Sequence, residues 1–121
     1  MRLVDSSGWI EFFTGGPLAG EYAKHLKDTA RVLTPTIVLY EVYKKIKRDR
    51  TEEEALSAVS MMNRMKVIDL SESIALLAAD LSIAHSLPMA DAIVFATAVE
   101  ADCKVVTSDV HFRELVRVMF I

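Results

Sequence analysis

Short β-prone runs alternate with helical segments along the whole sequence, and this alternation constrains the fold more than any other feature. The expected strands are residues 2–5, 31–34, 66–70, 104–107 and 116–121. The expected helices are residues 8–13, 17–27, 35–48, 51–65, 71–85 and 88–102, with a short helix after Ser108-Asp109. Strands that alternate with helices pair in parallel through right-handed crossovers, and the helices cover both faces of the sheet. The sequence therefore predicts an α/β fold with a central, mainly parallel sheet of about five strands.

Capping residues and prolines set the expected helix starts. Pro35 and Pro88 suit a first helical turn, because the N–H group that proline lacks has no partner there. Residues 51–54 have the form of a capping box, with an acidic residue three positions after the hydroxyl of Thr51. Ser71 is expected to cap the Ala- and Leu-rich helix that follows it.

Length and composition restrict the class of protein. The 121 residues fit one domain, residues 1–121, and 52% hydrophobic with 26% charged residues is typical of a globular chain. No apolar run approaches the ~20 residues needed to cross a bilayer, and the N-terminus lacks the charged lead and apolar core of a secretory signal. We therefore expect a cytoplasmic protein with no membrane contact. The single Cys103 excludes a disulfide framework and thiolate metal sites.

Two aspartates follow predicted strands. Asp5 ends the first strand, and Asp109 comes two residues after Thr107 at the end of the fourth. Ligands of open α/β sheets bind outside the carboxyl ends of the strands, so both carboxylates face one crevice if these strands are neighbours. The alternative for each residue is a helix cap: Asp5 for the helix from Gly8 onward, and Asp109 or Ser108 for the short helix that follows.

Glu41 lies within an otherwise apolar helical stretch, so its carboxylate is expected to be partly buried. A buried charge without a partner is costly, and Glu41 therefore needs a cation, a hydrogen-bonded partner or a proton. Lys44 and Lys45, three and four positions further on, offer a simple ion pair as the alternative to a metal.

Asp91 repeats this pattern at the start of the apolar helix that follows Pro88. Its alternative role is a favourable charge near a helix N-terminus. The four carboxylates of Asp5, Glu41, Asp91 and Asp109 together form a set that repels itself unless a positive group lies between them. Carboxylate oxygens suit hard cations, which predicts Mg²⁺, with Mn²⁺ as the other candidate. Such ions activate water and stabilise a leaving oxygen in phosphodiester hydrolysis without a side-chain nucleophile.

The order and spacing of these motifs resemble PIN domains, most closely the toxin ribonucleases of VapC type. The resembling segments are Asp5-Ser6 after a strand, residues 36–42 around Glu41, residues 87–98 around Asp91, and the Thr-x-Asp of residues 106–112 with Phe112 three positions after Asp109. The resemblance covers essentially the whole chain.

The resemblance implies a PIN-like three-layer α/β/α fold and a metal-dependent endoribonuclease, the toxin of a type II toxin–antitoxin pair. It implies that Asp5, Glu41, Asp91 and Asp109 hold the metal directly or through water. It also implies that Ser6 or Thr107 helps to position water or phosphate. RNA is then the substrate, and the expected partners are a second copy of the chain and a small cognate antitoxin that inserts into the acidic groove.

The net charge of −3 argues against nucleic-acid binding by bulk electrostatics. Without the four proposed ligands, however, 13 acidic residues face 14 basic ones, so the remaining surface is nearly balanced. One dense basic tract follows Glu41 and consists of Lys44, Lys45, Lys47, Arg48 and Arg50. Its candidate roles are contact with RNA phosphates, contact with an acidic antitoxin segment, or simply a solvated helix end whose cations suit the helix dipole.

Two other functions fit parts of the sequence. A PIN-like module that binds RNA or protein without cutting would keep the fold, but the complete acidic set favours an enzyme. A nucleotide-binding α/β domain is excluded because no P-loop or dinucleotide glycine pattern occurs among only 4 glycines. His25, His85 and His111 are scattered, and we expect them to be surface or loop residues rather than general bases.

Overall fold

The computed structural model describes residues 1–121 and contains one parallel five-stranded sheet in the order β3-β2-β1-β4-β5. The strands are β1 (Arg2–Val4), β2 (Val32–Pro35), β3 (Lys66–Ile68), β4 (Lys104–Thr107) and β5 (Val118–Phe120). The predicted α/β class and the parallel sheet of five strands are therefore confirmed.

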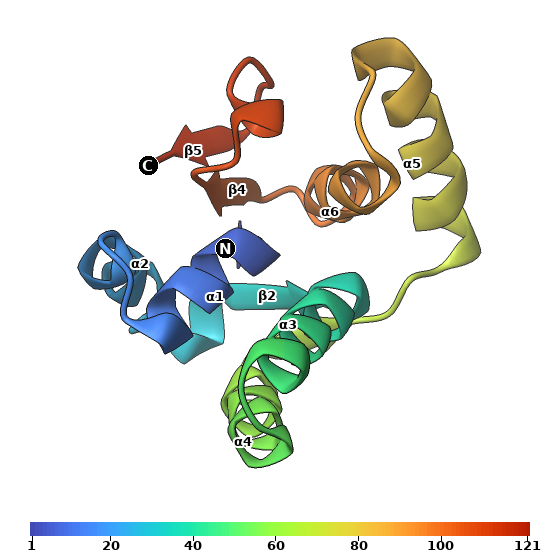
Figure 1. Cartoon of the computed structure of the whole chain (residues 1–121). Coiled ribbons are helices and arrows are strands. Elements are labelled where there is room, and N and C mark those ends of the chain that lie inside the picture. The colour runs from blue at the N-terminus through green and yellow to red at the C-terminus, as the bar shows by residue number, and fades with distance from the viewer.

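Six α-helices and two 3₁₀ turns connect the strands. They are α1 (Ser6–Thr14), α2 (Ala19–Leu26), η1 (Thr29–Arg31), α3 (Thr36–Asp49), α4 (Glu52–Met62), α5 (Glu72–His85), α6 (Met89–Glu100) and η2 (Val110–Phe112). Helices α1 to α4 connect strands from β1 towards β3, whereas α5 and α6 lead back across the sheet to β4. Right-handed crossovers place these two groups on opposite faces, which gives three layers, and Figure 1 shows α5 packed beside α6.

Some boundaries differ from the predicted ones. Pro35 and Pro88 do not occupy first helical turns but are N-cap residues, with extended ψ values of 145° and 155°. An N-cap residue has a non-helical backbone, and the fixed φ of proline allows this as readily as a first turn. The last strand begins at Val118 instead of residue 116, because Arg117 adopts a left-handed φ of 65°. The 3₁₀ turn η1 was not predicted.

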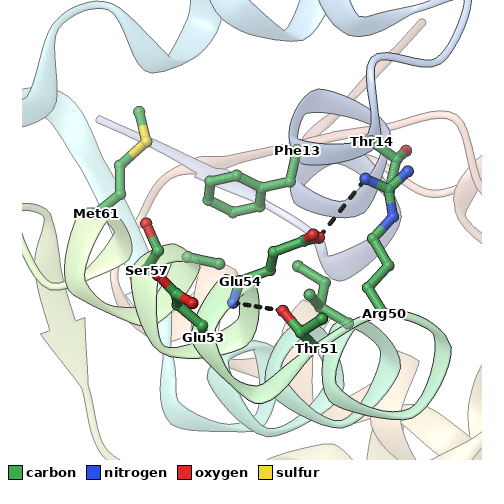
Figure 2. A pocket seen from close by; sticks show the side chains of 10 residues that line it. Phe13, Thr14, Arg50, Thr51, Glu53, Glu54, Ser57 and Met61 are labelled. Carbon is green, nitrogen blue, oxygen red and sulfur yellow. Dashed lines mark hydrogen bonds and ion pairs between the residues drawn. The ribbon is translucent and has the colours of Figure 1, made fainter.

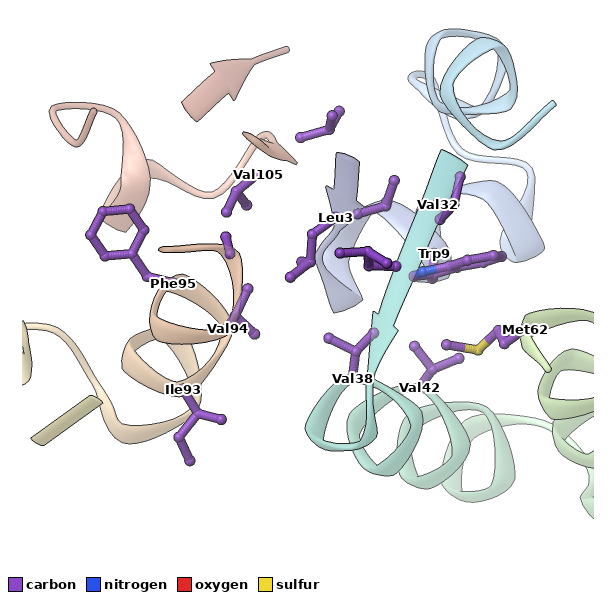
Figure 3. Packing of buried hydrophobic residues seen from close by; sticks show 14 of the residues in the cluster. Leu3, Trp9, Val32, Val38, Val42, Met62, Ile93, Val94, Phe95 and Val105 are labelled. Carbon is purple, nitrogen blue, oxygen red and sulfur yellow. The ribbon is translucent and has the colours of Figure 1, made fainter. Parts of the chain in front are cut away.

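The hydrophobic core is formed by buried residues of the strands and of the helices that pack on them, α3 and α6 among them. Figure 3 shows Val38 and Val42 of α3 close to Trp9 and Met62. Every residue from 92 to 98 in α6 is buried, so this helix is surrounded on all sides rather than on one face. A helix held this firmly fixes the position of Asp91 in its first turn. No single helix is long and apolar enough to span a membrane, and only α5 and α6 taken together, bent by 115°, pass that length and composition test.

The chain reverses direction across the sheet at the centre, between β1 and β4. From β1 it proceeds through β2 to β3, and it then returns to β4 on the other side of β1. Asp5 directly follows β1, and β4 ends at Thr107 beside it. A crevice at such a switch point is the usual ligand position of parallel α/β folds.

Candidate active site

Asp5 is buried at the end of β1 with only 4% of its surface exposed. One carboxylate oxygen, Oδ1, accepts hydrogen bonds from the Gly8 backbone N–H at 3.1 Å and from the Ser7 hydroxyl at 2.8 Å. The capping role considered from the sequence is therefore present, and Asp5 is the N-cap of α1. Its second oxygen, Oδ2, points instead towards β4.

Thr107 connects the two central strand ends. Its Oγ1 donates a 2.6 Å hydrogen bond to Asp5 Oδ2 and accepts one of 2.9 Å from the Asp109 backbone N–H. Burial raises the pKa of Asp5, and the hydrogen bonds from Thr107, Ser7 and Gly8 partly oppose this rise. The carboxylate is thus held in one orientation at an electrostatic cost.

Asp91 and Asp109 approach each other through His111. The His111 Nδ1 atom lies 2.9 Å from Asp91 Oδ2 and 3.1 Å from Asp109 Oδ1. Asp109 Oδ1 also accepts the His111 backbone N–H at 2.9 Å, so the capping alternative for Asp109 is realised at η2. One ligand atom from each of these three residues falls within 4.8 Å of the others, the spacing of a group able to hold a metal ion.

Glu41 lies in the second turn of α3 and is half-buried. The simple ion pair with a nearby lysine does not form, because Lys44 contacts the Tyr40 hydroxyl and Lys45 pairs with Asp49. Burial raises the pKa of Glu41, and the Ser6 hydroxyl lowers it. The negative charges of Asp91, Asp5 and Asp109 raise it further.

The pKa of Asp91 is raised as well, first by burial and then by the charge of Asp109, while His111 lowers it. A nearby negative charge disfavours the ionised form of a carboxyl group. The charges of the four carboxylates predicted from the sequence therefore act on one another near the carboxyl edge of the sheet. An all-oxygen donor set that carries excess negative charge matches the preference of Mg²⁺ and Mn²⁺, so the residues present fit such an ion.

Sequence comparison adds the family. The model of the PIN domain matches residues 2–118. The chain belongs to the PIN domain family. Comparison with curated protein sequences gives no significant match.

Solved structures share this PIN fold over most of their length. A toxin–antitoxin complex from Klebsiella pneumoniae superposes with a TM-score of 0.82 at 23% identity, covering 98% of this chain and 96% of that one. VapBC2 from Rickettsia felis bound to a promoter DNA fragment gives 0.77 at 13% identity, covering 99% and 96%. VapC20 from Mycobacterium tuberculosis, described as a sarcin–ricin loop cleaving toxin, gives 0.74 at 18% identity, covering 87% of each chain.

One residue of this PIN domain was missed by the sequence reasoning. His111 is exposed, as expected of a surface histidine, with 54% of its side chain accessible, yet it contacts two of the acidic residues. Its spacing offered a signal, because it follows Thr107 and Asp109 at successive two-residue intervals. Asp91 comes from another helix, and nothing in the sequence pattern places it beside His111.

A pocket with a volume of about 680 Å³ lies elsewhere in the PIN domain, between α1, α3 and α4. Figure 2 shows Phe13 and Met61 on its wall, together with the Arg50–Glu54 ion pair of 3.7 Å. None of the four site carboxylates lines it. Charge convergence rather than cavity size therefore identifies the candidate active site.

Proposed function

We propose that this PIN domain, residues 1–121, is a metal-dependent endoribonuclease that acts as the toxin of a type II toxin–antitoxin pair. Asp5, Glu41, Asp91 and Asp109 hold Mg²⁺, or Mn²⁺, directly or through water. The observation that carries the proposal is the convergence of these carboxylates at the sheet's switch point, with burial and mutual repulsion raising three of their pKa values.

A bound divalent cation would supply an activated water and would stabilise charge on the leaving oxygen of a phosphodiester. The protein's own contribution is to hold the carboxylates in place before the cation arrives. Three hydrogen bonds fix Asp5, and the buried α6 fixes Asp91. Preorganised charge of this kind avoids reorganisation during the reaction.

Ser6 and Thr107 have different positions in this scheme. Thr107 is fully buried and already donates to Asp5, so its role is to orient Asp5 and Asp109 rather than to touch water or phosphate. Ser6 is partly exposed and lines a groove together with Glu41. The Ser6 hydroxyl is therefore the better candidate for positioning water or a phosphate oxygen.

The partners follow from the relatives. Two of the similar structures are toxin–antitoxin assemblies, and a third is of a toxin described as cleaving the sarcin–ricin loop. These likenesses support RNA as the substrate and a cognate antitoxin as the inhibitor of this chain. The further proposal that a second copy of the chain completes a homodimer rests on the family resemblance of the sequence. A short gene overlapping the start of this one would provide inexpensive support for the toxin role.

The test is cleavage of structured and single-stranded RNA by purified, antitoxin-free protein with Mg²⁺ or Mn²⁺, compared with the same reaction in EDTA. Wild type should cut only with metal, and Asp5→Asn and Asp91→Asn should lose at least about 100-fold in rate. Asp80→Asn, an exposed aspartate on α5 outside the site, is the matched control and should cut normally. Equal cutting by wild type, Asp5→Asn and Asp91→Asn would show that the proposed site is wrong.

The second candidate is a PIN module that binds RNA or protein without cutting. It predicts that metal-loaded wild type leaves both kinds of RNA intact while still binding one of them. The complete set of four carboxylates favours the enzyme.

A further inference from the structure

We propose that a groove along α3 binds the single-stranded RNA segment next to the phosphate that is cut. This α3 groove is lined by Ser6, Ile10, Tyr40, Glu41, Lys44, Lys45 and Arg48. In this arrangement Lys44 and Arg48 contact phosphates, and the Tyr40 ring stacks on a base. The inference rests on the proposed nuclease function and adds the path of its substrate.

The α3 groove is continuous with the acidic site. Glu41 and Ser6 both line the hollow, which has a volume of about 250 Å³. At a helical rise of about 1.5 Å per residue, the seven intervals between Glu41 and Arg48 extend the groove by about 10 Å along α3. A strand whose phosphate lies at Glu41 therefore passes directly over the cationic part of the groove.

Two of the five residues of the basic tract form ion pairs with α4. Lys47 pairs with Glu52 at 3.4 Å, and Arg50 pairs with Glu54 at 3.7 Å, both in the acidic first turn of α4. These two cations connect α3 to α4. Neither of them lines the α3 groove.

The three cations that line the groove are paired with fewer carboxylates than would neutralise their charge. Lys45 and Arg48 share one carboxylate, that of Asp49, at 2.8 and 2.9 Å. Lys44 contacts no carboxylate, and its Nζ donates only to the Tyr40 hydroxyl at 3.3 Å. Exposed pairs of this kind contribute little to stability, so the side chains are free to turn towards phosphates. The excess positive charge is thus placed beside the acidic site in a chain whose net charge is −3.

Tyr40 decides between the two candidate partners of the basic tract. It is a large aromatic residue with 57% exposure, and the Lys44 amine lies 5.5 Å from its ring centroid. An exposed ring beside cations is the combination by which proteins bind single-stranded nucleic acid, through base stacking and phosphate contact together. The charge of an acidic peptide would account for the cations alone, whereas single-stranded RNA accounts for the cations and the ring together, so we assign the groove to RNA.

The chain contains a matched control for the test. Lys47 contacts Tyr43 with nearly the same geometry as Lys44 contacts Tyr40, at 3.2 Å to the hydroxyl and 5.3 Å to the ring centroid. Lys47→Met removes the same kind of side chain from the same helix, but on the side that faces α4. Both variants therefore lose one positive charge from α3, but only Lys44→Met removes a cation that lines the groove.

The experiment measures binding of a fluorescent single-stranded oligouridylate by anisotropy, in an Asp91→Asn background that prevents cutting, with Mg²⁺ present. Lys44→Met should weaken binding about threefold to tenfold and lower the slope of log affinity against log salt by about 0.7. Lys47→Met should leave both quantities unchanged, and Lys44→Arg should restore them. Tyr40→Leu should cost about fivefold or more, and Tyr43→Leu much less. Lys44 and Tyr40 are exposed, so equal thermal midpoints will confirm that the variants fold.

Equal weakening by Lys44→Met and Lys47→Met would overturn the inference. So would a loss of antitoxin affinity in Lys44→Met at unchanged RNA affinity, because that result assigns the groove to an acidic protein segment. Failure of the nuclease proposal looks different: wild type would cut no RNA while Lys44→Met still selectively weakened RNA binding.

Discussion

The Thr107 hydroxyl donates a 2.6 Å hydrogen bond to Asp5 Oδ2 and so joins the ends of β1 and β4, two residues 102 positions apart in the chain. Because the same hydroxyl accepts the Asp109 backbone N–H, one side chain holds both the carboxylate of Asp5 and the backbone of Asp109. Neither bond is open to water, since Thr107 is fully buried.

Thr107→Val should therefore be costly although the side chains have similar shapes. It leaves a buried carboxylate oxygen and a backbone N–H without their partner, and a hydrogen bond to a charged group contributes about 1.5–3 kcal/mol. We expect a loss in this range in the free energy of unfolding measured with urea. Thr107→Ser keeps the hydroxyl and should lose much less, and equal losses for Val and Ser would assign the effect to packing.

Asp91→Asn should stabilise the metal-free protein. Burial and the charge of Asp109 raise the pKa of Asp91, which means that its ionised form is unfavourable in the fold. Removing this charge should increase the free energy of unfolding at neutral pH by about 0.5–2 kcal/mol, the usual range for optimising a charge. Asp5→Asn should instead destabilise, because an amide cannot accept all three hydrogen bonds that reach Asp5.

The Asp91→Asn gain should depend on pH. A carboxyl group with a raised pKa in the fold contributes stability that is fully present below its unfolded pKa of about 4 and is lost as the pH rises through the folded pKa. The metal-free wild type should thus lose stability relative to Asp91→Asn as the pH rises from about 4 towards neutral. Urea unfolding at a series of pH values tests this, and a gap that widens towards acid would contradict it.

Divalent metal should reverse this penalty. A cation that binds only the folded state stabilises it by about 2.7 kcal/mol at a concentration 100 times its Kd. Mg²⁺ or Mn²⁺ should therefore raise the thermal midpoint of wild type by several degrees and that of Asp91→Asn by much less. The exposed Asp80→Asn variant should respond like wild type, and an equal response from all three would place the ion elsewhere.

His111→Ala should weaken metal binding. By contacting Asp91 and Asp109 together, His111 holds two proposed ligands at a fixed separation. Loss of such an orienting residue typically reduces metal affinity by 10- to 100-fold. Titration with Mn²⁺, followed calorimetrically, gives the affinity directly. Tighter binding by His111→Ala would instead mean that the imidazole competes with the ion.

The sequence predicted the alternation of strands and helices because hydrophobic spacing and caps are local properties. It also placed Asp5 and Asp109 at strand ends. The two residues were expected to lie together only if their strands are neighbours, and β1 does pair with β4. Local sequence patterns could not decide whether Asp5 and Asp109 cap helices or belong to the acidic cluster. In the structure both residues do both. Capping and metal binding are thus not mutually exclusive for a carboxylate with two oxygens.

Tertiary contacts account for what sequence reasoning missed. The proximity of His111 to Asp91 depends on how α6 packs relative to η2, and neither segment carries a signal of the other. The division of the basic tract likewise depends on α4, whose glutamates pair with Lys47 and Arg50 but leave Lys44 without a carboxylate partner. The sequence alone does not indicate which of the five basic residues form ion pairs with α4.

The most direct test of the account is the chemistry of the RNA ends that metal-loaded protein produces, read by mass spectrometry. Attack by water at a site made of Asp5, Glu41, Asp91 and Asp109 predicts hydrolytic ends without a 2′,3′-cyclic phosphate, formed only with Mg²⁺ or Mn²⁺ and lost in Asp91→Asn. Cyclic phosphate ends that persist in EDTA and in Asp91→Asn would show that the RNA's own 2′-hydroxyl attacks, and they would contradict the proposed metal site.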